Sequence, residues 1–302
     1  MTRTRAAISS RFQKILERTA LTTGDLTAFA RHKQTVVDAL VARGILVNNV
    51  HTMGSFERGS AIRTVSDIDL LVVVKRKEVA WGDGQKSSNR LLEAFRSSLI
   101  DRFPSTGIGR DGQAVVIDFG DGSHPVDVVP AFYERQGGPY NHPIFSIPDG
   151  AGGWMETSPS SHNKYIQAAD QRAASHLIPL AQIFKYWCAS RTGGVPISGF
   201  HVEMMLSATN IAAGVRTYSQ KFFLLLALLT ERKCAALNDP VEISGRIAAC
   251  STEAKRTQAL ASVYDAAVHA RAAFQAEERE DFQEAWRQWN IVFKDTFPRD
   301  GV

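Results

Sequence analysis

Ile68 to Val74 reads IDLLVVV, and this run dictates much of the fold. An unbroken series of β-branched residues and leucine predicts a strand that is buried on both faces, as in the centre of a sheet. Two more strands are predicted over 114–119 and 125–132, joined by a hairpin turn at 121–123. A helix over about 87–103 separates the first strand from this pair, so this part of the chain is mixed α/β.

The rest of the chain is predicted to be mostly helical, because apolar residues recur there at helical spacing. The expected helices cover 5–20, 25–43, 165–191, 200–213, 218–235, 253–275 and 278–294. Residues 134–163 are rich in Gly, Pro, Ser and Asn, and we interpret them as a linker.

Composition excludes several classes of protein. With 44% hydrophobic and 22% charged residues among 302, the chain is typical of a globular protein. The longest strongly apolar run, 222–229, is far shorter than the roughly 20 residues of a membrane span. The N-terminus MTRTRAAISSRFQ has no apolar signal core, so we expect a cytoplasmic protein. Three cysteines without CxxC spacing indicate reduced structural thiols, and not disulfides or a zinc site.

The excess of positive charge is local. Residues 1–24 carry a net charge of +4, which is the net charge of the whole chain. A solvated helix face explains such a cluster better than a nucleic-acid-binding patch.

Two carboxylates stand at the start of the first strand, in HTMGSFERGSAIRTVSDIDLLVVV (51–74). Asp67 and Asp69 are two positions apart, so on a strand both side chains point the same way. Like charges about 6–7 Å apart on a buried strand are costly unless a cation lies between them, and Mg²⁺ is the expected cation because it prefers oxygen ligands. Upstream, Gly54-Ser55 is predicted to open a helix after a short strand and to bind phosphate.

A later strand supplies the third carboxylate. Asp127 in PVDVVP and Asp118 in VVIDFG are the two candidates. We favour Asp127 because apolar residues flank it on both sides, whereas Asp118 runs directly into a turn.

The motif GSxxRGxAxRxxSDIDLLV followed by VDVVPA resembles the nucleotidyltransferase superfamily related to DNA polymerase beta. It is similar to the branch that contains the bacterial cGAS/DncV-like nucleotidyltransferases (CD-NTases), animal cGAS and the oligoadenylate synthetases. Residues 180–206, LAQIFKYWCASRTGGVPISGFHVEMML, resemble the segment in which a helix lysine contacts the triphosphate and a serine–aromatic–His sequence supports the base. The ending EAWRQWNIVFKDTFP is also similar to bacterial members.

The resemblance implies roles for several residues. Lys185 would contact the triphosphate and Phe200 would stack on the base, while Glu203 would be structural. Family members often have a second serine where Gly199 stands, so one phosphate contact is either missing or supplied by Ser198. The zinc-binding insertion of the animal DNA sensor is absent, so activation by DNA is not implied.

The resemblance also implies a fold and its domains. We expect an α/β (α+β) fold, with a polymerase-beta-like palm built on a mixed sheet, a C-terminal helical domain, and the active site in the cleft. The expected domains are N-terminal bracing helices at 1–48, a nucleotidyltransferase core at 49–160 and a helical domain at 161–302. Asp67, Asp69 and Asp127 would hold two Mg²⁺ ions, for which Mn²⁺ can substitute.

The implied reaction joins nucleoside triphosphates, with release of pyrophosphate, into a cyclic di- or trinucleotide second messenger. ATP and GTP are the expected substrates, with pyrimidine nucleotides open. The product would act on a separate effector protein in bacterial antiphage signalling, and a regulatory protein partner is left open. The alternatives are a linear oligonucleotide synthetase, an enzyme that modifies an RNA end or a small molecule such as an antibiotic, and a non-enzymatic binding module.

Overall fold

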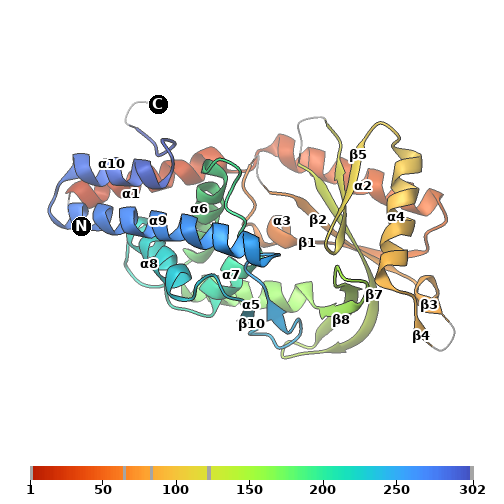
Figure 1. Cartoon of the computed structure of the whole chain (residues 1–302). Coiled ribbons are helices and arrows are strands. Elements are labelled where there is room, and N and C mark those ends of the chain that lie inside the picture. Colours follow the sequence, from red (N-terminus) through yellow and green to blue (C-terminus); the bar gives the residue numbers. More distant parts are fainter. Residues whose placement is uncertain (1–2, 64–65, 82–83, 121–123, 300–302) are drawn as a thin grey trace. The chain divides into compact units, whose positions relative to one another are not determined.

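The chain forms two compact units in a computed structural model that describes residues 3–63, 66–81, 84–120 and 124–299. We call Leu21–Lys164 with Val241–Gly245 the sheet unit. Met1–Ala20, Tyr165–Pro240 and Arg246–Val302 make up the helical unit. Figure 1 shows the main sheet in the first and the majority of the helices in the second. The hairpin turn predicted at 121–123 lies outside the described residues.

A seven-stranded mixed sheet forms the sheet unit, as the predicted fold class requires. Its strands are β1 (Val47–Met53), β2 (Ile68–Val74), β5 (Gly107–Asp111), β6 (Ala114–Asp118), β7 (Val126–Gly137), β8 (His142–Pro148) and β9 (Trp154–Thr157). Five strands follow the order β1-β2-β7-β6-β5, and β8 and β9 continue from the second half of β7. The strands β2 and β7 pair in parallel, and their neighbours pair with them antiparallel. The predicted bounds of β2 are confirmed.

Each face of this sheet has its own apolar core. The sheet unit also contains α2 (Thr23–Ala42), α3 (Gly54–Arg58), α4 (Ser88–Arg102), the short helix η1 (Arg76–Glu78) and the strand pair β3 (Ala80–Trp81) and β4 (Gly84–Gln85). Leu70 and Val72 of β2 pack with buried residues of α2 and α4, whereas Leu71 packs on the other face with residues of β8. Because side chains alternate along a strand, Asp69 lies on the same face as Leu71.

The linker interpretation of residues 134–163 is wrong. This segment contains the end of β7, all of β8 and β9, and the start of α5. Its turn residues join short strands: Gly138 and Asn141 have φ values of 72° and 50° in the loop between β7 and β8. Between the turns, Ile144 and Ile147 are buried. These two positions lie on opposite faces of β8, and burial on both faces stabilises a strand that the Gly and Pro content conceals.

The helical unit confirms most of the predicted helices. Its elements are α1 (Arg3–Thr19), most of α5 (Pro159–Arg172), α6 (Leu177–Ser190), α7 (Gly199–Ser207), α8 (Tyr218–Glu231), α9 (Glu253–Glu278), α10 (Phe282–Val292) and the pair β10 (Leu237–Asn238) and β11 (Arg246–Ile247). The helix predicted over 165–191 is two helices. Ala174 and Ser175 have φ values of 51° and 59°, and the Asp170 carboxylate accepts hydrogen bonds from the first two N–H groups of α6.

The predicted N-terminal segment 1–48 is divided between the two units. In α1, the fully buried Phe12 lies in an aromatic cluster with Phe222 of α8 and Trp289 of α10. Helix α2 begins after the capping residue Thr22 and packs its buried side on the core of the sheet unit. Each helix therefore belongs to the unit whose core buries its apolar face.

The basic residues of α1 are partly used in packing. Arg5 forms an ion pair with Glu278, and the guanidinium of the buried Arg11 lies 4.6 Å from the ring centroid of Phe282. These contacts favour the interpretation of this charge cluster as a helix face.

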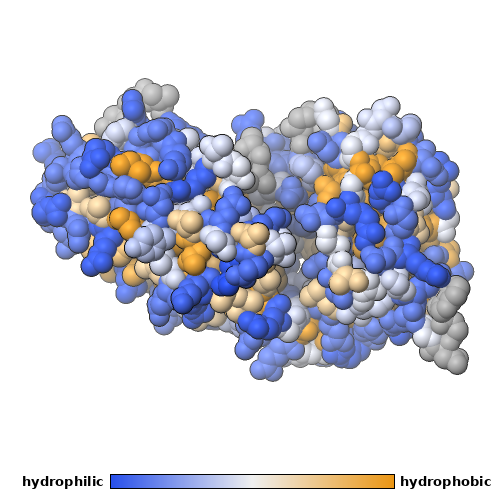
Figure 2. Space-filling view, in the orientation of Figure 1, coloured by the Kyte–Doolittle hydropathy of each residue, from blue (hydrophilic) through white to orange (hydrophobic). Residues whose placement is uncertain are grey.

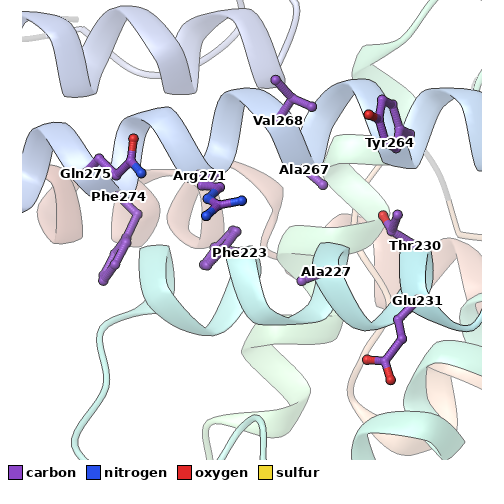
Figure 3. Close-up of a pocket in the computed structure, with 10 residues that line it drawn as sticks. All are labelled: Phe223, Ala227, Thr230, Glu231, Tyr264, Ala267, Val268, Arg271, Phe274 and Gln275. Atoms are coloured by element: carbon purple, nitrogen blue, oxygen red, sulfur yellow. The ribbon is translucent and has the colours of Figure 1, made fainter.

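A groove of about 650 Å³ runs between α8 and α9 on the helical unit. Figure 3 shows Phe223 and Phe274 side by side at one end, Ala227 and Ala267 along the middle, and Tyr264 at the other end. Apolar residues also appear among polar ones over these helices in Figure 2.

No helix in the described part of the chain is long and apolar enough to cross a membrane. The three cysteines are free thiols. Burial raises the pKa of Cys234 to about 11, as expected for a structural thiol.

Candidate active site

The three predicted carboxylates lie on one face of the sheet unit. The strand register places Asp69 of β2 beside Asp127 of β7, and Met53 of β1 beside Asp69 on the other side. Asp67 stands two residues before Asp69, at the entry to β2, and is more exposed than Asp69 and Asp127, which are half-buried. The structure therefore brings Asp67, Asp69 and Asp127 together on the face opposite α2 and α4.

The Gly54-Ser55 turn lies directly against this group. As predicted, β1 ends at Met53 and α3 begins at Gly54. Gly54 has a φ of 68°, and a Cβ atom there would lie 1.7 Å from Oδ2 of Asp69. The carbonyl of Ser55 accepts hydrogen bonds from the N–H groups of Ser60 and Ala61, which closes the turn. Glycine is thus required both by backbone conformation and by the space that the Asp69 carboxylate occupies.

Burial, together with mutual repulsion, raises the pKa values of two of these carboxylates. Burial raises the pKa of Asp127 to about 7, with additional increases from the charges of Asp67, Asp69 and Asp111. Burial also raises the pKa of Asp67, which the nearby His124 partly offsets. A fold that gathers negative charge in this way is stabilised by a bound cation or by protons.

The carboxylate oxygens of Asp67, Asp69 and Asp127 are hard ligands that fit a divalent cation such as Mg²⁺. Among the described residues, no three His, Cys, Asp or Glu side chains form a ready-made metal cage. Proteins usually bind Mg²⁺ through one or two carboxylates together with water and substrate phosphates.

The alternative carboxylate, Asp118, is placed differently. It lies at the exposed end of β6, opposite Gly107 of β5, and its Oδ1 accepts a hydrogen bond from the N–H of Gly120. It is therefore a turn residue, as expected for a carboxylate that runs into a glycine-rich loop.

The second group of predicted residues lies in the helical unit. Lys185 of α6 forms an ion pair of 2.9 Å with the fully buried Glu203 of α7. A Cβ atom at Gly199 would lie 2.7 Å from Cε of Lys185, so the lysine side chain passes through the space that a side chain at this position would need. A serine at Gly199 would therefore require the flexible end of the Lys185 side chain to shift.

Ser198 and Phe200 flank this glycine at the start of α7. Ser198 is the N-cap residue: its hydroxyl accepts a hydrogen bond from the N–H of His201, and its own N–H donates to the carbonyl of Ala249. Phe200 is half-buried in the first turn of the helix. The buried His201 bonds through Nδ1 to the carbonyl of Ile247. The predicted nucleotide contacts of Lys185, Ser198 and Phe200 stay predictions.

Two residues near these groups, and the pairing of Glu203 with Lys185, were not found from the sequence. Asp111 lies in β5, where the glycine-rich sequence GIGRD hides the strand. His124 approaches Asp67 because the chain enters β7 beside the start of β2. The role of Glu203 as the partner of Lys185 depends on how α6 and α7 pack, so it carries no sequence signal beyond its position in an apolar helix.

Comparisons with known proteins show similar sequences. The family model of the Second Messenger Oligonucleotide or Dinucleotide Synthetase domain matches residues 7–170. A probable cyclic nucleotide synthase of Bacillus cereus is 27% identical over 164 residues, covering 46% of this chain and 49% of that protein. A cyclic AMP-AMP-AMP synthase of Escherichia coli is 26% identical over 160 residues, covering 51% and 47%. The chain spans about half the length of these curated relatives.

Solved structures share the fold across almost the whole chain. The structure of E. coli CdnC with ATP matches with a TM-score of 0.71 at 20% identity, covering 96% of this chain and 98% of that one. A complex of CdnC with HORMA-deltaN matches at 0.69 and 19% identity, with the same coverage. The Bradyrhizobium diazoefficiens CD-NTase CdnG with GTP matches at 0.67 and 11% identity, covering 94% and 98%.

Proposed function

Because this chain belongs to the Second Messenger Oligonucleotide or Dinucleotide Synthetase family, we propose that it is a Mg²⁺-dependent nucleotidyltransferase that makes a cyclic di- or trinucleotide second messenger. The observation that carries this proposal is the register of β2 and β7, which sets Asp69 beside Asp127 with Asp67 two residues away. Curated relatives that make cyclic nucleotides support the choice of product.

The residues of the sheet unit account for the chemistry. Asp67, Asp69 and Asp127 would hold two Mg²⁺ ions, which supply Lewis-acid activation of the acceptor hydroxyl and neutralise the leaving pyrophosphate. Gly54 keeps the backbone close to Asp69, which lets the turn approach a phosphate. No protein nucleophile takes part, so catalysis depends on positioning and electrostatics.

We assign nucleotide binding to residues of the helical unit. Lys185 would donate charge-assisted hydrogen bonds to the triphosphate, and its ion pair with Glu203 holds the ammonium in a defined direction. Phe200 would stack on a base, a contact that tolerates different sequences. ATP or GTP is the proposed substrate, and relatives of the same fold bind these nucleotides.

The biological setting is proposed from the family. The product would activate a separate effector protein in defence against phage. A regulatory protein partner is proposed too, since the fold relative CdnC forms a complex with HORMA-deltaN.

The test is a product assay. The purified protein is incubated with all four nucleoside triphosphates and Mg²⁺ or Mn²⁺, treated with phosphatase and studied by mass spectrometry. We expect pyrophosphate release and a cyclic product that phosphatase leaves intact. A D69N preparation should form none, whereas a D118N preparation should match the parent. Phosphatase-sensitive chains alone, or transfer to an RNA or a small molecule, would contradict cyclisation, and no pyrophosphate with any nucleotide would contradict the enzyme.

A further inference from the structure

His124 is a buried histidine outside the predicted site residues, with both ring nitrogens facing defined partners. Its side chain is 5% exposed. Nδ1 lies 2.6 Å from the carbonyl oxygen of Ser66, and since a carbonyl only accepts, Nδ1 carries the proton and donates. The ring meets Phe56 of α3 edge to face, with centroids 5.3 Å apart. The orientation of the imidazole is thus fixed by packing as well as by the hydrogen bond.

The backbone on both sides of Asp67 is held by hydrogen bonds to the segment 124–125, and the bond from His124 to Ser66 is the first of the two. The residue after His124, Pro125, accepts a hydrogen bond of 2.8 Å from the N–H of Ile68. The peptide group before Asp67 is therefore held by His124, and the one after it by Pro125. Asp127 of β7 follows Pro125 by two residues, so the segment 124–127 links the position of Asp67 to that of Asp127.

The other side of the imidazole faces α2. Nε2 lies 3.8 Å from Oδ1 of Asp25. Oδ2 of Asp25 accepts hydrogen bonds of 2.7 Å from both the N–H and the hydroxyl of Thr22, as part of the capping box of α2. Asp25 is therefore fixed independently of His124 and offers it a carboxylate of defined position.

We infer that His124 is a positioning residue that sets the spacing of Asp67 and Asp127 for divalent metal binding. The inference rests on the proposed function, because it assumes that these carboxylates hold the metal. Groups that orient metal ligands without touching the metal typically change affinity 10- to 100-fold when they are replaced. His124 acts on Asp67 through the hydrogen bond from Nδ1 to the backbone carbonyl of Ser66. Its effect on metal affinity therefore depends on a donor at the position of Nδ1.

Two amide substitutions separate the roles of the ring nitrogens. In H124N the side-chain NH₂ can take the place of Nδ1 and donate to the Ser66 carbonyl. In H124Q the longer side chain places its NH₂ near the position of Nε2, toward Asp25, and the carbonyl loses its donor. Both variants keep a neutral polar side chain, so they form a matched pair.

The readout is binding of Mn²⁺ alone, followed by the electron paramagnetic resonance signal of the free ion. We expect H124Q to raise the Kd for Mn²⁺ by about 10-fold or more, and H124N to stay within about threefold of the parent. D67N is the reference for loss of a direct ligand. Melting temperatures are measured in parallel, and the comparison is made at a temperature where both variants are folded.

The outcomes distinguish this inference from the proposed function. If H124Q binds Mn²⁺ as tightly as the parent, or if both variants lose affinity equally, the positioning role of Nδ1 is overturned while the metal site stands. If the parent binds no Mn²⁺, or if D67N binds it as tightly as the parent, the assignment of the metal site is wrong. The inferred role of His124 is then wrong too.

Discussion

Asp127 is the residue whose ionisation the fold opposes most clearly among the three carboxylates. Its pKa is raised from 3.8 to about 7, first by burial and then by the charges of Asp67 and Asp69. Between these values Asp127 stays protonated in the folded protein but is ionised in the unfolded chain. The folded state then binds more protons, so this group makes the metal-free protein less stable as pH rises from about 4 to about 7.

We predict that the free energy of unfolding changes less between pH 4 and pH 7 in D127N than in the parent protein. The full contribution is at most about 4 kcal/mol, because each unit of pKa corresponds to about 1.4 kcal/mol. Urea denaturation of the metal-free parent and of D127N, at pH 4 to 8, measures the difference. The parent should also release protons when Mn²⁺ is added near pH 6.5, since a metal ligand must be ionised. Parallel profiles for the two proteins would contradict the assignment.

Gly54 and Gly59 provide a matched pair of substitutions. Both have φ near 70°, but a Cβ atom at Gly59 meets nothing within 4 Å, whereas one at Gly54 would overlap the carboxylate of Asp69. The backbone cost of about 1–2 kcal/mol is common to G54A and G59A. We predict that G59A lowers stability by that amount and keeps synthesis, and that G54A loses synthesis as well. Denaturation measures the stability of each variant, and the product assay measures its synthesis. A fully active G54A would show that Asp69 is free to move.

The ion pair of Lys185 complicates a simple alanine test. K185A would remove the proposed phosphate contact, worth about 1.5–3 kcal/mol or roughly 10- to 150-fold in nucleotide affinity. It would also leave the fully buried Glu203 without its ammonium, at a cost in folding of about 3–5 kcal/mol.

We therefore predict different results for two variants. K185A should lose both stability and nucleotide affinity, while K185M combined with E203Q should recover the melting temperature but not the affinity. Calorimetry with a non-hydrolysable nucleotide and thermal denaturation measure the two quantities separately. Unchanged affinity in the folded double variant would leave Lys185 with a structural role alone.

At the level of elements, long apolar patterns were read correctly, whereas short strands that contain Gly or Pro and one helix break were not. The apolar run of β2 and the spacing of Asp67 and Asp69 depend on neighbouring residues, so the sequence is sufficient to place them. The strands β5, β8 and β9 pair with strands that are their neighbours along the chain, but Gly or Pro within them favours a loop when they are viewed alone. The break between α5 and α6 occurs at Ala174 and Ser175, which adopt positive φ, and the sequence signal for it is Pro179 in the first turn of α6.

Helix α1 gives the prediction that belongs to this scale. Phe12 is fully buried and contacts four aromatic rings of α8, α10 and the segment after it. We predict that F12A costs about 3–5 kcal/mol. L26A is the control, because Leu26 of α2 is 50% exposed and should matter little. Hydrogen exchange should quicken in α8 and α10 of F12A and stay slow in β2 and β7. Faster exchange in the sheet unit instead would contradict the division of the two N-terminal helices.

At the scale of the whole molecule, the two units differ in how their cores are assembled from the chain. Both cores of the sheet unit draw their residues from between Phe29 and Met155, so they lie entirely within 21–164. The helical unit instead needs α1, whose Ile8, Phe12 and Ile15 are fully buried. A cut at residue 164 therefore leaves one core complete and the other without its N-terminal part.

We predict that fragment 21–164 folds by itself and that fragment 165–302 does not. Three buried apolar side chains contribute about 1.5–3 kcal/mol each, a sum comparable to the total stability of a typical domain. A peptide of residues 1–20 added to 165–302 should restore cooperative unfolding, followed by circular dichroism, whereas the same peptide with F12A should not. The sheet fragment lacks Val241–Gly245, whose Ile243 lies near Gly138, so local loosening is expected at the turn after β7. A folded 165–302 without the peptide would mean that α1 covers a core that is already stable, and the aromatic cluster around Phe12 would then be dispensable for folding.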